Sequence, residues 1–177
     1  MYSRIKLAGH PLHPMLVSYP IALYSLALVA YIVYAISSNT FWFQLGVVAT
    51  AGGVTMAVLA ALPGFLDWAF GVPARSVAKD HGLRHLLLNV SALVLFIITG
   101  IINLPQWAAA NPEKTWGIVL PLVGVVCTVV AGYYGWTMIQ NDHVGVALSP
   151  EQARLEPERA PASEDMTQLP GGLPAAQ

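Results

Sequence analysis

The side chains able to bind a metal or a haem are few in this sequence, and they lie at the ends of apolar segments. The chain has five histidines, and Asp67 closes the second apolar segment. Imidazole binds zinc, copper, iron and nickel, and it is also an axial ligand of haem iron. The residues in question are His10, His13, Asp67, His81, His85 and His143.

Two of these histidines each precede a proline, in Gly9-His10-Pro11-Leu12-His13-Pro14. A residue before proline is disfavoured in the α region, so both histidines are expected in an extended segment. Pro14 suits the first turn of a helix, where no backbone N–H is required. The motif therefore predicts two imidazoles held stiffly at the start of the first apolar segment.

A second pair, His81 and His85, stands four residues apart at the start of a predicted helix, and Asn89 extends the row. Residues at this spacing share one helix face, and two such histidines can chelate a metal. Asp67 closes the preceding apolar segment, where a carboxylate can bind a metal or orient a histidine. His143 follows the last segment, where an imidazole also interacts well with a helix C-terminus.

The elements that must position these residues are membrane helices. Of the 177 residues, 56% are hydrophobic and only 10% are charged, whereas a soluble domain has about 25% charged residues. Four apolar segments reach the about 20 residues needed to cross a bilayer. We therefore expect an all-α integral membrane four-helix bundle over residues 1–147, with helices at about residues 15–36, 43–66, 83–104 and 116–140.

The basic residues predict the orientation, because they concentrate on the cytoplasmic side of a membrane protein. Seven lie before the first helix, around the connection between the second and third, or after the fourth, whereas Lys114 alone lies on the other side. Up-down-up-down threading then places both termini, all the histidines and Asp67 at the cytoplasmic end. Residues 148–177, rich in proline, alanine and acidic residues, are expected to form a disordered cytoplasmic tail.

Small residues predict how the helices contact one another. The second helix carries Ala49, Gly53, Ala57 and Ala61 at successive spacings of four, and the fourth carries Gly124, Thr128 and Gly132. Such ridges let helix backbones approach closely in membranes. We expect a tight contact between the second and fourth helices, with homo-oligomer formation through the ridges as the alternative.

The same threading predicts a geometry for the site. His13 and His85 flank helices that run in the same direction, and packed helices lie about 8–10 Å apart. Their imidazoles should therefore converge. His81 and Asp67 are expected within roughly 10 Å of that pair, on the scale of the helix spacing. His143 is expected at the edge of this cluster.

Several functions are disfavoured by what the sequence lacks. The net charge is −1 and no basic stripe occurs, so nucleic-acid binding is not indicated. No charged residue lies in the middle of an apolar segment, which argues against a proton-driven transporter. Cys127 is the single cysteine and can form no internal disulfide.

Residues 9 to 146 resemble a bacterial family of predicted transmembrane proteins, domain of unknown function number twenty-two thirty-one. The resemblance rests on the His-Pro motif, on Gly64 with Asp67, on His81, His85 and Asn89, and on His143-Val144-Gly145-Val146. Members often have another histidine where this chain has Ser18. The resemblance implies a multi-pass protein of the bacterial cytoplasmic membrane near redox chemistry, without an established reaction.

Three hypotheses of function remain open at this point, and whether the chain is an enzyme is open with them. In the first, His13 and His85 bind a b-type haem whose propionates pair with Arg84, Arg75 or Lys79, and the protein serves a redox partner. In the second, a transition metal is bound. In the third, the protein is a structural subunit of a membrane complex without a cofactor. The metal ligands of the second hypothesis would be His10, His13, Asp67, His81 and His85, with Asn89 and His143 as further candidates.

Overall fold

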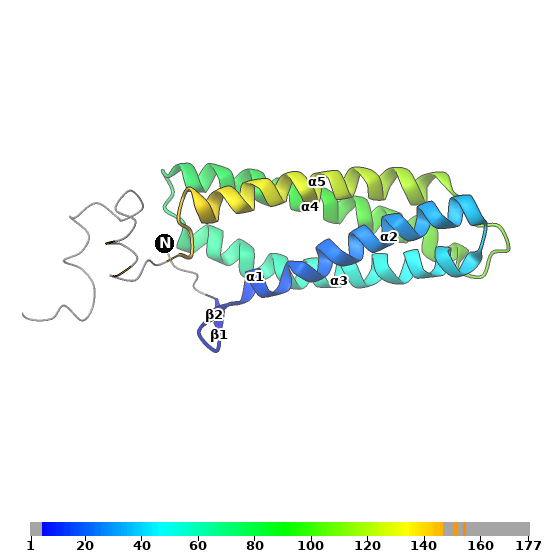
Figure 1. Ribbon diagram of the computed structural model, residues 1–177, viewed down its shortest axis with the longest axis horizontal. Coiled ribbons are helices and arrows are strands. Elements are labelled where there is room, and N and C mark those ends of the chain that lie inside the picture. The colour runs from blue at the N-terminus through cyan, green and yellow to red at the C-terminus, as the bar shows by residue number, and fades with distance from the viewer. Residues whose placement is uncertain (1–4, 147–150, 152–153, 155–177) are drawn as a thin grey trace, which may run out of the picture. The chain divides into compact units, whose positions relative to one another are not determined.

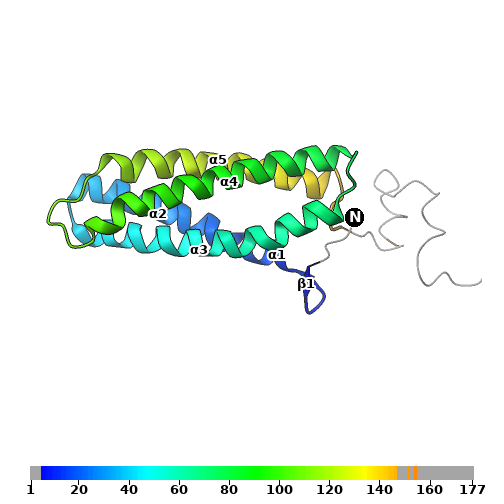
Figure 2. The ribbon, with the colours of Figure 1, turned by 180° about the vertical axis from the view of Figure 1, so that it is seen from behind.

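The computed structural model describes residues 5–146 together with residues 151 and 154. One compact unit spans Met1–Gly145. Its described part contains four helical spans that are long and apolar enough to cross a membrane. They run up, down, up and down (Figures 1 and 2), which confirms the predicted all-α membrane bundle. The predicted tail lies almost entirely outside the described residues.

The first span is built from α1, Leu12–Leu16, and α2, Ser18–Ser37. A hairpin of β1, Lys6–Leu7, and β2, His10–Pro11, precedes it. The hairpin turns through Ala8 and Gly9, which both have positive φ, as a tight two-residue turn requires.

The structure separates the two histidines of the His-Pro motif. His10 is in the extended strand β2, as predicted. An extended conformation was wrong for His13, which lies inside α1. Pro14 occupies the first turn of that helix, where a missing N–H costs no helical hydrogen bond. The helix can therefore begin before the proline.

The other spans are α3, Thr40–Gly71, α4, Val77–Asn103, followed by the short η1, Leu104–Gln106, and α5, Thr115–Gln140. The side chains of Asn39 and Ser76 cap the first backbone N–H groups of α3 and α4, as N-cap residues do. The helix α3 continues beyond Leu66, so Asp67 lies within its last turns.

The principal contacts join α2 with α3 and α4 with α5. The expected tight contact between the second and fourth helices, α3 and α5, was therefore wrong. The reason is that the small residues face rings instead of each other. A Cβ atom added at Gly53 would lie 2.7 Å from the Tyr24 ring, and one added at Gly124 would lie 2.7 Å from the Phe96 ring.

The Tyr24 and Phe96 rings, which lie against these glycines, meet at the centre of the bundle. Tyr24 and Phe96 stack with centroids 3.7 Å apart and planes 2° from parallel. Both side chains are buried. The central layer thus consists of two stacked rings, each of which also lies against a glycine of a neighbouring helix.

These residues belong to an internal repeat. His13 and Tyr24 are each 72 residues before His85 and Phe96, and Gly53 is 71 residues before Gly124. At these positions the hairpin of α1, α2 and α3 is therefore matched by the hairpin of α4 and α5. Equivalent helices run in the same direction, as in membrane proteins whose repeats are related by an axis along the membrane normal.

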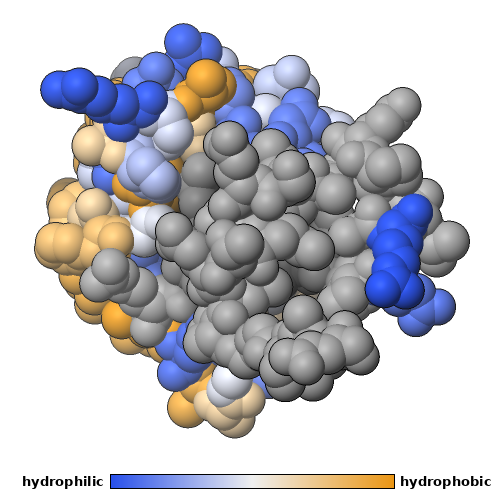
Figure 3. All heavy atoms as spheres, turned by 90° about the vertical axis from the view of Figure 1, so that its left-hand side faces the viewer, coloured by the Kyte–Doolittle hydropathy of each residue, from blue (hydrophilic) through white to orange (hydrophobic). Residues whose placement is uncertain are grey.

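The surface agrees with a membrane location. Large apolar side chains are exposed along the sides of the bundle, among them Val129 at 67% and Ile101 at 68%. At the end where α1 begins and α5 ends, hydrophilic residues lie among apolar ones around the visible rim (Figure 3). We call this the histidine end, because His13, His81 and His85 lie in helices that begin there and His143 follows the helix that ends there.

The central layer predicts a sharp difference between adjacent glycines. Gly53→Ala should lower the free energy of unfolding by about 1–3 kcal/mol, because the added methyl group overpacks the Tyr24 ring. Gly52→Ala is the control, since its Cβ would meet only Leu23 at 3.4 Å, and it should be neutral or slightly stabilising. Titration of both variants with a denaturing detergent measures this, and equal stabilities would contradict the packing described.

Candidate functional site

Two imidazoles meet at the histidine end of the bundle. His13 comes from α1 and His85 from the first turns of α4. Their ring centroids are 6.2 Å apart, and the ring planes are at 88° to each other. The predicted convergence of His13 and His85 is confirmed. The two residues are also equivalent in the internal repeat, so the pair lies across its axis.

Each ring is fixed by a hydrogen bond to the helix beside it. The Nδ1 atom of His13 lies 2.8 Å from the carbonyl oxygen of Ala60, and that of His85 lies 2.8 Å from the carbonyl oxygen of Ala131. A carbonyl oxygen can only accept, so Nδ1 carries the proton in both rings. In a neutral imidazole, Nε2 then carries the lone pair. Ala60 and Ala131 are 71 residues apart and are themselves equivalent.

Glycines allow both rings to approach the helix backbone. A Cβ atom at Gly64 would lie 2.6 Å from Nδ1 of His13, and one at Gly135 would lie 3.2 Å from the His85 ring. Any side chain at Gly64 would push His13 away from the carbonyl that holds it. The two glycines therefore determine where the imidazoles lie.

Asn89 distinguishes the two imidazoles. Its Nδ2 atom donates to the backbone oxygen of His85 at 2.8 Å and lies 3.2 Å from Nε2 of the same residue. The equivalent position in the first hairpin is Val17, which offers no such donor. Asn89 thus lies next to the lone pair of His85, as its place on the His81–His85 row predicted.

His81 and Asp67, which were expected beside this pair, each have a hydrogen-bond partner outside it. His81 contacts Asp142 instead, with Nδ1 and Oδ2 2.8 Å apart. Asp67 accepts a hydrogen bond from the backbone N–H of Ile5 at 3.1 Å. Within residues 5–146, no group of three or more His, Cys, Asp or Glu side chains could hold a metal ion together. The expected metal site of five residues therefore has no counterpart among these residues, and Asp67 and His81 have the hydrogen-bond partners just described.

The remaining candidates lie around this pair without joining it. His10 is exposed on β2. His143 follows α5 with a φ of 53°, and the next residue, Val144, donates its N–H to the carbonyl of Met138, which closes the helix end. The Arg84 guanidinium lies over the Tyr134 ring at 5.7 Å.

Lys79 has a structural role. Its ammonium group donates to the carbonyls of Trp68 and Ala69 at 2.6 and 3.2 Å, at the end of α3. The indole N–H of Trp68 donates in return to the carbonyl of Lys79 at 3.1 Å. This exchange closes the connection between α3 and α4, so Lys79 is engaged and is not available to a propionate.

The sequence reasoning missed the residues that hold the histidines. The carbonyls of Ala60 and Ala131 carry no side-chain signal, and Asp142 was not among the predicted site residues. One signal was present. The spacing from His13 to Tyr24 is repeated from His85 to Phe96, and the spacing from Gly53 to Gly64 recurs from Gly124 to Gly135. A search for internal repeats would have paired the two histidines directly.

The His81–Asp142 contact is expected to stabilise the histidine end. His81→Gln and Asp142→Asn should each reduce stability, and the double variant should lose about 1 kcal/mol less than the sum of the two, as coupled neighbours do. The matched control is the double variant His10→Gln/Asp142→Asn, in which the stability losses of the two single variants should be additive. If the losses caused by His81→Gln and Asp142→Asn are additive instead, the contact contributes nothing to stability in solution.

Comparison with known proteins agrees with the fold. The family model described as "Predicted membrane protein (DUF2231)" matches residues 9–148. No curated protein and no solved structure matches the chain. The matched range includes all four helical spans and both imidazoles of the pair. The chain therefore belongs to the DUF2231 family of predicted membrane proteins, and it is a multi-pass member.

Proposed function

We propose that the protein is a small electron-transfer protein of the membrane that binds one b-type haem between His13 and His85. The observation that carries this proposal is the paired geometry of the two imidazoles. Their centroids lie 6.2 Å apart, and each Nδ1 is bonded to a carbonyl at 2.8 Å. The following paragraphs take the spacing, the number of ligands and the protonation in turn.

The spacing is that of two ligands on opposite sides of one metal. A ligating imidazole nitrogen lies about 2.0 Å from its metal, and the ring centre about 1.1–1.2 Å beyond the nitrogen, so two opposed rings have centres about 6.3 Å apart. The observed separation is 6.2 Å. The angle of 88° between the planes is compatible with this, because each ring can rotate about its own bond to the metal.

The number of ligands favours haem over a bare metal ion. A zinc site takes at least three protein ligands, and the described residues offer no group of three. Haem iron receives four nitrogens from the porphyrin and needs only two axial ligands from the protein. A pair of histidines is therefore a complete protein contribution to a haem and an incomplete one to a zinc site.

The protonation of both rings suits ligation. Metal-bound histidines usually donate their second N–H to a carbonyl or carboxylate, which fixes the tautomer and makes the ligand more basic. The carbonyls of Ala60 and Ala131 are placed for this role. If His85 bound a metal, its Nε2 atom would lose the 3.2 Å contact with Asn89. The 2.8 Å hydrogen bond from Asn89 to the backbone oxygen of His85 would remain.

A haem held by this pair would also need apolar walls and a partner for its propionates. Its apolar faces require apolar walls, which the membrane helices supply, and glycine backbone at Gly64 and Gly135 lies beside the two imidazoles. Arg84 adjoins His85 and is exposed, so it is the proposed partner of a propionate. A bound haem would supply one-electron transfer, with the two imidazoles and their hydrogen bonds tuning its potential.

The distribution of basic residues supports an orientation for this site. In sequence, Arg84 and six of the seven other lysines and arginines precede α1, lie near the connection between α3 and α4, or follow α5, and basic residues mark the cytoplasmic side. We infer that the histidine end faces the cytoplasm of a bacterial inner membrane. A redox partner would then reach the haem from that side.

The haem proposal predicts a spectrum. Protein purified from cells supplied with haem should show a Soret band and a pyridine haemochrome of about one haem per chain. His13→Gln and His85→Gln should each abolish the low-spin spectrum, because one axial ligand is lost. His10→Gln and His81→Gln are matched controls, since neither residue belongs to the pair, and both should retain the spectrum.

Two results would reject the proposal. One is haem-free wild-type protein from haem-replete cells. The other is unchanged haem binding after both substitutions at the pair. If the two variants only lower thermal stability while the protein's cellular role persists, the structural hypothesis is supported, in which the imidazoles tie helices together through Ala60 and Ala131.

The glycine beneath His13 offers a second test that leaves both ligands in place. Gly64→Ala should displace the imidazole, because the new methyl group would lie 2.6 Å from Nδ1. We expect lower haem occupancy and a shifted midpoint potential. Gly132→Ala is the control, since nothing lies within 4 Å of its Cβ. A potential and occupancy equal to wild type in both variants would contradict the proposed positioning.

A further inference from the structure

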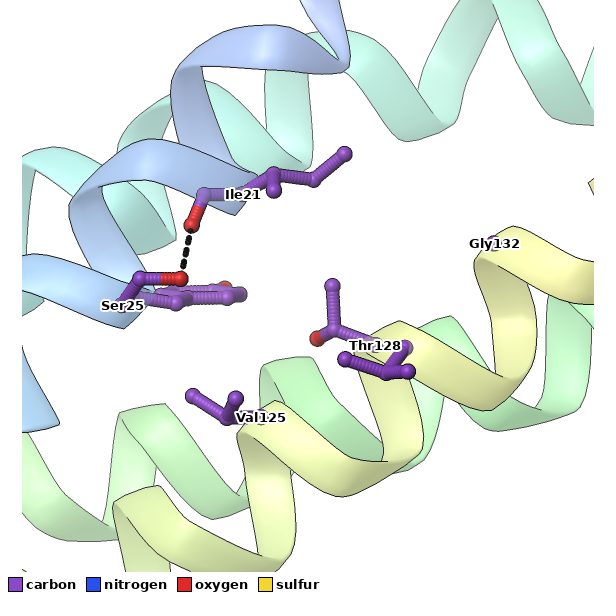
Figure 4. Close-up of a pocket in the computed structure, with 7 residues that line it drawn as sticks. Ile21, Ser25, Val125, Thr128 and Gly132 are labelled. Atoms are coloured by element: carbon purple, nitrogen blue, oxygen red, sulfur yellow. Dashed lines mark hydrogen bonds between the residues drawn. The ribbon is translucent and has the colours of Figure 1, made fainter.

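A groove runs along the seam between α2 and α5, in the middle of the bundle (Figure 4). Its volume is about 190 Å³. Figure 4 shows the side chains of the two helices facing one another across it. The lining is mostly apolar, with three hydroxyl-bearing residues, and consists of Ile21, Tyr24, Ser25, Val125, Thr128, Val129 and Gly132.

The Tyr24 hydroxyl has no hydrogen-bond partner among the residues that the structure describes. The side chain is only 3% exposed and forms part of the groove wall. Buried hydroxyl groups are nearly always hydrogen-bonded, so an unpaired one requires an explanation. A molecule in the groove that accepts a hydrogen bond would complete it.

The other two hydroxyls of the groove have already used their protons. Ser25 donates to the carbonyl of Ile21 at 2.8 Å, as Figure 4 shows, and Thr128 donates to the carbonyl of Gly124 at 2.9 Å. Both oxygens retain lone pairs and can still accept. Tyr24 is thus the free donor of the groove, and Ser25 and Thr128 are potential acceptors.

The internal repeat supplies a comparison within the same molecule. A second groove, on the seam between α3 and α4, has Phe96 and Ile97 where the first has Tyr24 and Ser25. The two seams are equivalent in the repeat, yet the free hydroxyl occurs in only one of these two grooves. Packing alone does not require that hydroxyl, because phenylalanine fills the equivalent position.

The depth of the groove identifies the class of ligand. Tyr24 is twelve residues from one end of its span and thirteen from the other, and Thr128 is equally central. Phospholipid ester carbonyls lie at the edge of the hydrocarbon core, about 15 Å from its midplane. An acceptor that reaches Tyr24 must therefore belong to a molecule dissolved within the bilayer.

We propose that the groove between α2 and α5 binds the ring of a lipid-soluble quinone, with one quinone carbonyl accepting a hydrogen bond from Tyr24. The volume is below the about 300–1,000 Å³ of a site for a drug-sized ligand, so it admits a ring and leaves the isoprenoid tail in the bilayer. Exposed Ile21 and Val129 provide an apolar surface for that tail. This binding does not depend on haem.

The test measures binding of a short-chain ubiquinone, labelled with ¹³C at its carbonyls, to full-length protein in nanodiscs. Titration should show saturable binding, and infrared difference spectra should show a carbonyl band shifted to lower frequency. Tyr24→Phe should weaken binding about three- to tenfold, as loss of one neutral hydrogen bond does, and should remove the shifted band. It copies Phe96, so the fold should tolerate it.

Two glycines provide a matched pair of groove-filling variants. Gly132→Leu should weaken quinone binding more than tenfold, because it fills the groove without meeting another atom at its Cβ. Gly100→Leu fills the second groove in the same way and should bind like wild type. The haem-free double variant His13→Gln/His85→Gln should also bind like wild type, which separates this proposal from the haem proposal.

Three outcomes would overturn the inference. Tyr24→Phe with wild-type affinity and an unchanged carbonyl band would remove the hydrogen bond on which it rests. Equal losses in Gly132→Leu and Gly100→Leu would show that the α2–α5 groove is not the site. A shifted band arising from phospholipid ester carbonyls, in place of the labelled quinone, would identify a lipid as the occupant.

Discussion

The structure depends on aromatic and imidazole rings that rest directly on the backbone of a neighbouring helix. At Gly53, Gly64, Gly124 and Gly135 a hydrogen atom stands where any other residue would place a carbon in contact with a ring. In a bilayer the hydrophobic effect does not drive helices together, so close packing of this kind must hold them. The same contacts determine how far each ring reaches into the bundle, and so they link stability to the position of the site.

The internal repeat explains why the site is a pair. One hairpin contributes an imidazole, a carbonyl that orients it and a glycine that makes room for it, and the second hairpin contributes the same three groups. Divergence between the hairpins is then informative. Asn89 replaces Val17 beside one imidazole, and Tyr24 stands opposite Phe96 in the central stack. These departures from symmetry occur where the proposed ligands would bind.

Much of the fold was predictable from apolar length, because a segment of about 20 residues without charge has few alternatives to spanning a bilayer. The convergence of His13 and His85 followed from threading alone, since both begin helices that run in the same direction. The tight packing of the second and fourth helices was predicted wrongly. A ridge of small residues indicates close approach, but it does not say whether a backbone or a ring will fill the space.

The sequence by itself therefore determined the membrane bundle, its threading and the end of the bundle at which the histidines lie. Only the tertiary structure decided which of them meet. His81 contacts Asp142, Asp67 accepts a hydrogen bond from the backbone of Ile5, and the imidazoles of His13 and His85 lie together. The physical reason is that a hydrogen bond depends on a few tenths of an ångström and on direction. Helix periodicity places residues on a face but does not select their partners.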